Sequence, residues 1–163
     1  MSIVCVYDRT EVDVVNLLNA ISKIKKTGFS SLTEEEQTNW YSGMKGARNY
    51  TDINRIESNC ETIADMVGIT ITTKTDWSDA DFIKNEDINR ILGNISIIRE
   101  IYSLVYDDTP VVSDPPINTI YKINDIEKIL YDKYNIIYNN SINKYYCGES
   151  FYSNSDISYG ELL

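Results

Sequence analysis

Residues 40–60 read WYSGMKGARNYTDINRIESNC, and they hold the turn and the helix start around which the rest of the chain is organised. Gly43 and Gly46 permit backbone angles closed to other residues, which predicts a sharp turn between two helices. Asn49 or Thr51 can then cap a new helix, because either side chain can bond to the free amides of the first turn. The stretch therefore predicts a helix–turn–helix junction.

A long amphipathic helix follows the turn. Asp52 lies in its expected first turn, where the helix dipole favours a negative charge. Apolar residues then recur every three or four positions, which is typical of one buried helix face: Ile53, Ile56, Cys60, Ile63 and Val67. Gly68 comes next, in the usual position for a helix C-terminus. The pattern predicts that this helix is central to the core.

The polar side chains around the turn have two interpretations. They are candidate docking residues, together with Trp40, Gly43, Gly46 and Asn54: Lys45, Arg48, Asn49, Asp52 and Arg55. In one interpretation they form a polar face that docks a partner chain. In the other, which we favour, Arg55 or Lys45 pairs with Asp52 or Glu57 in a buried network that fixes one conformation. Trp40 and Trp77 are expected to be core anchors.

The same stretch resembles a module of tail-region proteins from phages, prophages and phage-like particles of low-GC Gram-positive bacteria. The family block is Trp-x-x-Gly-Leu/Met-Lys-Gly-Ala-x-Asn-x-Thr-Asp-Leu/Ile-Asn-Arg-Val/Ile-Glu. Further matching pieces stand in the same order along the chain: Tyr7-Asp8-Arg9-Thr10, Lys74-Thr75-Asp76-Trp77, Asn124-Asp125-Ile126-Glu127-Lys128-Ile129-Leu130 and Tyr146-Cys147-Gly148-Glu149. Members of this family are virion components without known catalysis, close to tail-fibre and baseplate functions, and many carry the module beside other domains.

The resemblance implies a structural part of a phage or phage-like particle that acts by protein–protein docking, made in the bacterial host cytoplasm and multimeric in the particle. Two alternatives stay open: a tail-fibre assembly factor or chaperone, and a cell-wall-active enzyme. The sequence does not separate an infectious phage from a bacteriocin-like particle.

Composition excludes several function classes. The chain has 163 residues, 25 acids against 15 bases and a net charge of −10, which argues against a nucleic-acid surface. With three separated cysteines and no histidine, neither a zinc site nor a histidine-based catalytic triad is expected. No phosphate-binding glycine motif, signal peptide or membrane-length apolar run is present. We therefore expect no catalytic residue, cofactor, metal or membrane partner.

The remaining periodicities predict a mainly α fold, a compact bundle of four to five helices. The first helix is expected to start at a cap on Asp8 or Thr10 and to end at Gly28, and Thr10 and Asp13 stand at capping-box spacing. The second is expected from Thr33, which has the same spacing to Glu36, to Tyr41. Two further helices are expected from Asn85 to about Ser103 and from Asn118 to about Asn139. Residues 3–7 and 69–75 are predicted to be short strands or extended connectors. Residues 107–117 hold all three prolines and are predicted to be non-helical.

Residues 1–140 are predicted to form the helical domain, and residues 141–163 an extended or hairpin-like tail. The tail is rich in Tyr, Ser, Asn and Gly. Because aromatic residues are enriched at interfaces, the tail is the best interface candidate. Its candidate contact residues are Tyr145, Tyr146, Phe151, Tyr152 and Tyr159. It either packs on its own helices or binds a partner chain.

Overall fold

A computed structural model describes residues 2–102 and 120–153, with side chains placed in residues 2–102 and 123–141. The described residues form five α-helices and one 3-10 turn. They are α1 (Glu11–Thr27), η1 (Phe29–Ser31), α2 (Glu34–Tyr41), α3 (Tyr50–Val67), α4 (Asn85–Glu100) and α5 (Ile120–Ser153). The prediction of a mainly helical fold is confirmed.

The first two helices start where their capping residues predict. At the start of α1 the amide of Thr10 donates to Asp13 Oδ2 at 2.8 Å, and the Thr10 hydroxyl accepts from the Asp13 amide. Thr33 and Glu36 repeat this reciprocal arrangement at the start of α2. These bonds satisfy amides that a helix otherwise leaves without partners.

The third helix starts at the glycine-rich turn. Asn49, and not Thr51, is the N-cap of α3, and its amide donates to Asp52 Oδ2 at 3.2 Å. Gly68 ends the helix in the left-handed conformation, with φ +72°. The sequence therefore locates both ends of α3 correctly.

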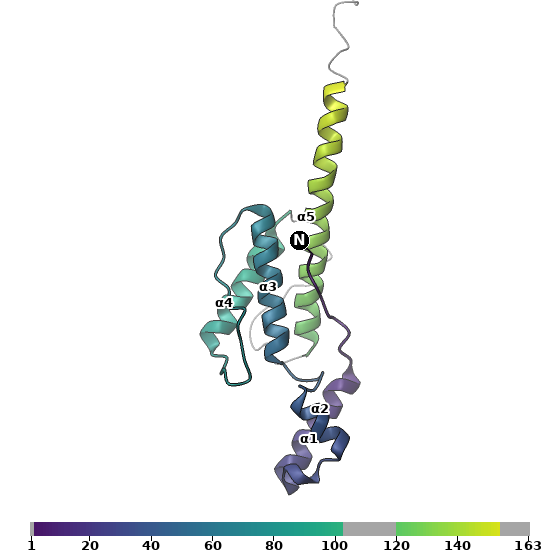
Figure 1. The fold of residues 1–163 in the computed structure, drawn as a ribbon, viewed down its shortest axis with the longest axis vertical. Helices are drawn as coiled ribbons and strands as arrows, with labels where there is room; N and C mark the ends of the chain where they lie inside the picture. Colours follow the sequence, from purple (N-terminus) through teal and green to yellow (C-terminus); the bar gives the residue numbers. More distant parts are fainter. Residues whose placement is uncertain (1, 103–119, 154–163) are drawn as a thin grey trace, which may run out of the picture.

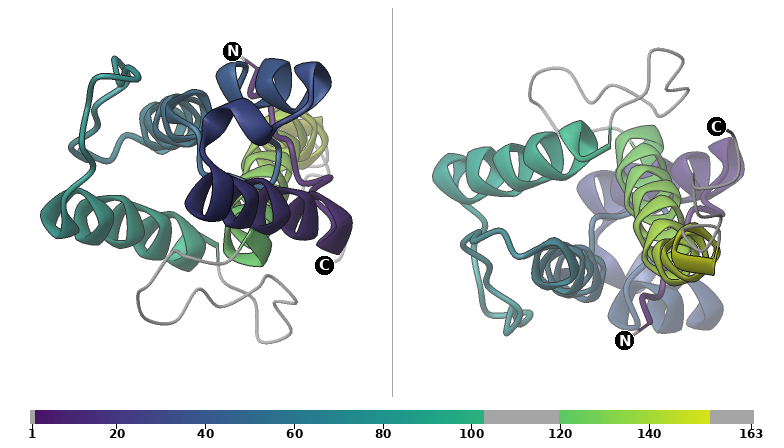
Figure 2. Two further views of the ribbon diagram at one scale, coloured as in Figure 1. Left: turned by 90° about the horizontal axis from the view of Figure 1, so that it is seen from below. Right: turned by 90° about the horizontal axis from the view of Figure 1, so that it is seen from above.

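Helices α3, α4 and α5 pack together and enclose the main core. We call these three helices, together with two extended segments at residues 2–9 and 69–78, the body. Isoleucine dominates the interior, with Trp77 at its edge. Figure 2 shows α3 end-on while α4 lies across the view, so these two helices cross steeply. The fully buried side chains include Ile63, Ile98, Ile129 and Leu130, all at 0% exposure.

Helices α1 and α2, joined by η1, form a separate lobe below the body (Figure 1). Its buried residues are only Ala20 and Leu32. Phe29 provides most of its aromatic packing, with ring centroids 6.4 Å from Trp40 and 5.4 Å from Tyr41. Trp40 is thus half-buried in the lobe and is not part of the main core, whereas Trp77 is buried there at 5% exposure.

The N-terminal segment of the body, residues 2–9, lies extended against α3 and α5 and forms no strand. Asn59 of α3 accepts from the Val4 amide at 3.4 Å and donates to the Val4 carbonyl at 2.7 Å. Asn124 of α5 bonds to the backbone of Arg9 in the same way: it accepts from the Arg9 amide at 3.4 Å and donates to the Arg9 carbonyl at 2.9 Å. Each amide side chain replaces one residue of a neighbouring strand, which explains how an unpaired segment is fixed in place.

The second extended segment follows α3 and uses the same device. Asn54 of α3 accepts from the Trp77 amide and donates to its carbonyl, both at 2.8 Å. The Thr72 carbonyl accepts from Asn94 of α4 at 2.8 Å. Residues 3–7 and 69–75 are therefore extended connectors, the second of the two predicted alternatives.

Helix α5 is much longer than the pattern predicts. It crosses residue 141 without a break and continues to Ser153, so the extended or hairpin-like form predicted for residues 141–163 is wrong as far as that residue. No proline interrupts the stretch, and each added residue extends an existing helix by one further hydrogen bond. Residues 154–163, with Tyr159, and the proline-rich residues 107–117 lie outside the described part.

Candidate docking surfaces

The glycine-rich turn fixes the lobe to the body. Gly43 has φ +84°, in the left-handed region that favours glycine. Gly46 lies so close to α1 that a Cβ there would be 2.2 Å from the Asp13 carbonyl oxygen. Glycine is required at position 46 because any side chain would push α1 away.

A buried network of charges lies behind this turn. Arg9 pairs with Asp52 Oδ2 at 2.5 Å, and Arg55 pairs with Asp52 Oδ1 at 2.8 Å. Arg55 also reaches Glu127 of α5 at 2.6 Å. Glu127 has no exposed surface and accepts a further bond from the Val6 amide at 3.3 Å. The network joins the N-terminal segment, α3 and α5.

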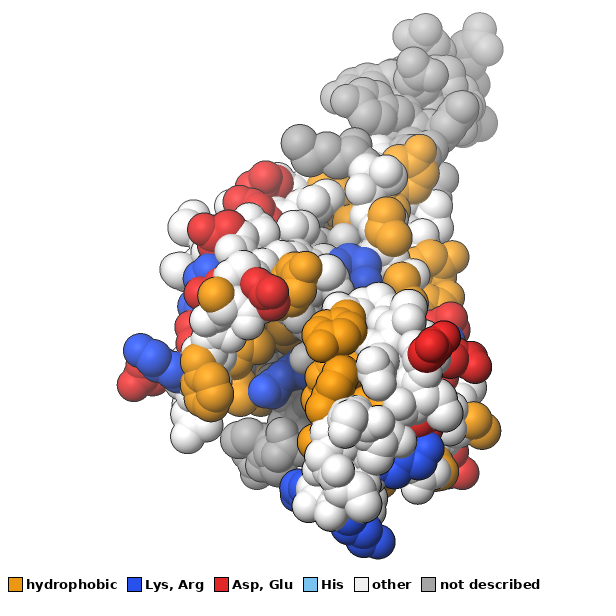
Figure 3. Space-filling model, turned by 60° about the horizontal axis from the view of Figure 1, so that its bottom comes forward, with side chains coloured by type: hydrophobic (Ala, Val, Ile, Leu, Met, Phe, Trp, Pro, Cys, Tyr) orange, Lys and Arg blue, Asp and Glu red, His pale blue; other side chains and the backbone are white. Residues whose placement is uncertain are grey.

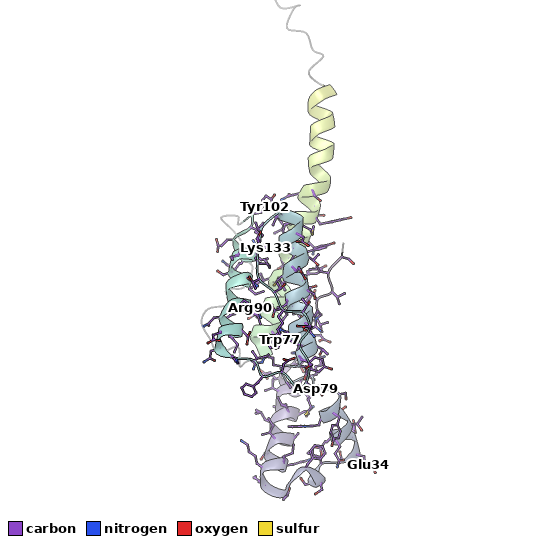
Figure 4. All side chains as sticks on the ribbon, turned by 60° about the vertical axis from the view of Figure 1, so that its left-hand side comes forward. Glu34, Trp77, Asp79, Arg90, Tyr102 and Lys133 are labelled. Carbon is purple, nitrogen blue, oxygen red and sulfur yellow. The ribbon has the colours of Figure 1, made fainter. Side chains whose placement is uncertain are left out.

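Glu57 forms a second buried centre on the other side of α3. Its carboxylate accepts from Trp77 Nε1 at 2.9 Å, from the Lys74 amide at 2.9 Å and from both terminal nitrogens of Arg90. Trp77 and Arg90 both lie in the body, while Glu34 marks the far end of the lobe (Figure 4). Glu57 therefore fixes the second extended segment between α3 and α4.

The predicted polar residues thus divide into buried and exposed ones. Asn54, Asp52 and Arg55 bond inside the body, as the network interpretation requires. Lys45 does not reach them: it is exposed and pairs with Asp8 at 2.9 Å. Arg48 is exposed and forms no ion pair with any described residue.

Sequence reasoning missed the partners of these groups. Glu127 lies 72 positions from Arg55, and Arg90 lies 33 positions from Glu57. Arg9 pairs with Asp52 from the N-terminal segment, so no local pattern links any of the three to its partner. One signal was available for Glu127, because it falls on the inner side of the α5 apolar period. Lys133, also fully buried, donates to the Ile101 carbonyl at 3.2 Å and had the same signal.

Burial controls the titration of the groups near the network. Desolvation raises the pKa of Glu127 above its ordinary value, although Arg55 opposes the shift. Burial, with the nearby Glu127 carboxylate, raises the pKa of the Cys5 thiol to about 12. Burial also raises the pKa of Cys60. Both thiols stay protonated at neutral pH, which makes them poor nucleophiles.

The lobe carries a polar groove of about 830 Å³ between α1, α2 and the glycine-rich turn. Gly43, Lys45 and Gly46 form its upper end, and the ion pair Lys23–Glu36 lies within it. Acidic, basic and apolar side chains are interspersed on the surface seen in Figure 3. The groove provides hydrogen-bonding groups without a strong charge of one sign.

An aromatic surface lies on α5. Tyr131 and Tyr138 are 43% and 46% exposed. The ring of Tyr131 packs on that of Tyr7, with 5.9 Å between the ring centroids. The rings of Tyr138 and Tyr134 are stacked, with 5.9 Å between their centroids. Beyond this surface α5 projects past the rest of the body (Figure 1). Four of the predicted tail contacts fall on the projecting turns: Tyr145, Tyr146, Phe151 and Tyr152.

Comparisons with protein-family models, curated proteins and solved structures find no match for this chain. Within residues 2–102 and 120–153, no helix is long and apolar enough to cross a bilayer. The same residues contain no cluster of three histidine, cysteine or acidic side chains arranged to hold a metal ion.

Proposed function

We propose that this chain is a non-enzymatic structural component of a phage or phage-tail-like particle, in the tail, baseplate or fibre-attachment region. One observation carries the proposal: three of the four separate pieces that resemble the tail-region family meet around α3, while the fourth, residues 146–149, lies on the projecting turns of α5. Arg9, Lys74 and Glu127 come from three different pieces, and each bonds to α3 or to its side chains. Three of the pieces that carry the resemblance therefore belong to one spatial arrangement in this chain, and this supports the proposal.

The chemistry of this arrangement favours docking over catalysis. Asp52, Glu57 and Glu127 each pair with arginine and accept amide or indole bonds, so their oxygens are occupied inside the fold. A general acid or base must instead reach a substrate within hydrogen-bond distance. The residues that distinguish this chain stabilise a rigid unit, and contacts with other proteins fall to its exposed surfaces.

Mass spectrometry of particles purified from the strain that encodes the chain tests this proposal. A structural component is expected at a fixed ratio to known tail proteins after repeated purification. Abundance in the lysate with absence from the particles would contradict the proposal and favour an assembly factor or chaperone.

A separate assay tests the enzymatic alternative. The purified chain is added to isolated host cell walls, and turbidity is followed against a known lytic enzyme. No clearing is expected. Clearing by the isolated chain would overturn the proposal in favour of a cell-wall-active enzyme.

A further inference from the structure

The sequence of α5 has a regular seven-residue repeat. Tyrosine occurs at every seventh position over four repeats: Tyr131, Tyr138, Tyr145 and Tyr152. The helix is continuous through all four positions. A seven-residue repeat with alternating steps of three and four residues is the pattern by which two helices pair along their length.

The intervening positions of the repeat are not tyrosine. They alternate with the tyrosines in steps of three and four residues: Lys128, Asn135, Ile142 and Glu149. The repeat thus starts with a cation and has an acid near its other end. In a parallel pair, each charge would face its own copy. In an antiparallel pair, the acid of one chain lies near the cation of the other.

The part of this surface that belongs to the body is open. Tyr131 and Tyr138 are about half exposed, and the Lys128 side chain is 50% exposed. The N-terminal segment covers α5 before Lys128, through Val6 on Glu127 and Arg9 on Asn124, and its Tyr7 ring packs against one side of Tyr131. The remaining surface of Lys128, Tyr131 and Tyr138 is open and leads into the projecting part of the helix.

The projecting part of α5 has the length to cover this surface in a second copy. Helix axes that run antiparallel with a two-fold axis at residue 140 place residues 128–138 of each chain beside residues 142–152 of the other. A two-fold contact of this kind is self-complementary, because each chain contributes both halves. An isolated helix of that length is marginal in water, so the projecting turns gain from such a contact.

We propose that this face docks a second copy of the same chain, forming an antiparallel helix pair through α5. In this register Tyr138 lies opposite Ile142 of the second copy, and Tyr131 lies opposite Glu149. Lys128 lies within one helical turn of Glu149 in the second copy. Tyrosine is suited to this role because it combines a large contact area with a polar group. The inference concerns self-association and stands independently of the particle in which the chain works.

Zero-length carbodiimide cross-linking of the natural full chain tests the register. On one helix Lys128 and Glu149 are about 31 Å apart at 1.5 Å per residue, so an amide bond between them can form only between two chains. Mass spectrometry of a mixture of light and ¹⁵N-labelled chains is expected to find the Lys128–Glu149 peptide pair with mixed isotopes. A parallel pair leaves these residues as far apart as one helix does. Absence of that pair while other cross-links form would overturn the antiparallel arrangement.

Analytical ultracentrifugation tests the self-association itself. A species of twice the 18.7 kDa chain mass is expected, with a population that rises with concentration. Tyr138→Glu is expected to weaken dimerisation at least about tenfold, since a carboxylate would be placed in the seam. Tyr41→Glu is the matched control, because Tyr41 is 78% exposed on the lobe, and it is expected to dimerise normally. Circular dichroism verifies that both variants fold. A natural chain that is monomeric at every concentration, or a folded Tyr138→Glu variant with unchanged dimerisation, would overturn the proposal.

Discussion

The body and the lobe of this molecule are stabilised in different ways. The body combines an isoleucine core with the buried acids Asp52, Glu57 and Glu127, which pair with arginines from elements that are distant in sequence. The lobe has two buried residues, Ala20 and Leu32, and depends on helix caps, surface ion pairs and the aromatic contacts of Phe29. Its link to the body is the glycine-rich turn, where Gly46 contacts the α1 backbone.

This difference indicates which part of the chain is more rigid. Buried ion pairs are costly to break, because removing one partner leaves an uncompensated charge. Surface pairs and caps contribute much less each. The body should therefore unfold as one cooperative unit, and the lobe should open at a lower free energy.

The largest effect is expected from Glu57→Ala in the body. The substitution removes the acceptor of Arg90, Trp77 Nε1 and the Lys74 amide, so the free energy of unfolding should fall by roughly 3–5 kcal/mol. Urea unfolding followed by circular dichroism measures the change. Glu61→Ala, an exposed change on the same helix, is the control and should cost less than about 0.5 kcal/mol. Similar costs for the two variants would show that the buried centre is not what stabilises the body.

A smaller effect is expected from Gly46→Ala at the junction. The new methyl group would meet the Asp13 carbonyl oxygen at 2.2 Å, so α1 must shift. Overpacking of this kind costs about 1–3 kcal/mol. Hydrogen exchange should accelerate in α1 and α2 and stay unchanged in α3. Equal acceleration in both parts would contradict a separate lobe.

Gly93→Ala should have the opposite sign. A Cβ at position 93 meets no atom within 4 Å, and the residue lies within α4. Alanine is favoured over glycine inside a helix, so the variant should be more stable by about 0.5–1 kcal/mol. Thermal unfolding of the Gly93→Ala and Gly46→Ala variants, each compared with the natural chain, measures the sign of both changes in stability. A destabilised Gly93→Ala variant would show that α4 needs glycine for a reason outside its local packing.

The smallest effect is the pH dependence of the lobe. Glu36 is bonded to Lys23 and to the Thr33 amide, and these contacts hold the pKa of its carboxyl below the ordinary value. The Thr10 amide and hydroxyl lower the pKa of Asp13 in the same way. A lowered pKa means that the unfolded chain binds the proton more readily. The stabilisation is therefore present above the ordinary pKa values and is lost as the pH falls through the lowered ones, between about pH 5 and pH 3.

Hydrogen exchange of α2, corrected for intrinsic rates, measures this loss across the same pH range. Glu36→Gln keeps a capping side chain but cannot titrate, so its α2 should show a flatter pH dependence. The acid sensitivity of Glu36 would be refuted if the variant and the natural chain had the same pH profile.

The caps and periodicities were sufficient to predict most of the fold. Thr10, Thr33 and Asn49 start their helices and Gly28 and Gly68 end theirs, because these signals act within a few residues. The end of α5 was missed for a related reason. Residues 141–153 are weak helix formers and include Gly148, but they contain no proline, and α5 continues through them despite their composition.

The candidate site was predictable only in part. Asp52 and Arg55 lie three positions apart on one helix, so their pairing follows from local spacing. The partners Arg9 and Glu127 come from the N-terminal segment and from α5, and only the folded structure brings them to α3. Of the two cations that the sequence offers for the buried pair, Arg55 reaches Asp52, whereas Lys45 pairs with Asp8.

Hydrogen exchange of the natural chain at two protein concentrations can show whether a rigid body held by buried charges docks through α5. Slow exchange is expected in α3 and at the amides of Val4 and Val6 at both concentrations, with faster exchange in α1 and α2. Residues 138–153 should exchange more slowly at the higher concentration, as a second copy covers them. Uniform protection of the lobe and the body, with no effect of concentration on α5, would contradict both expectations.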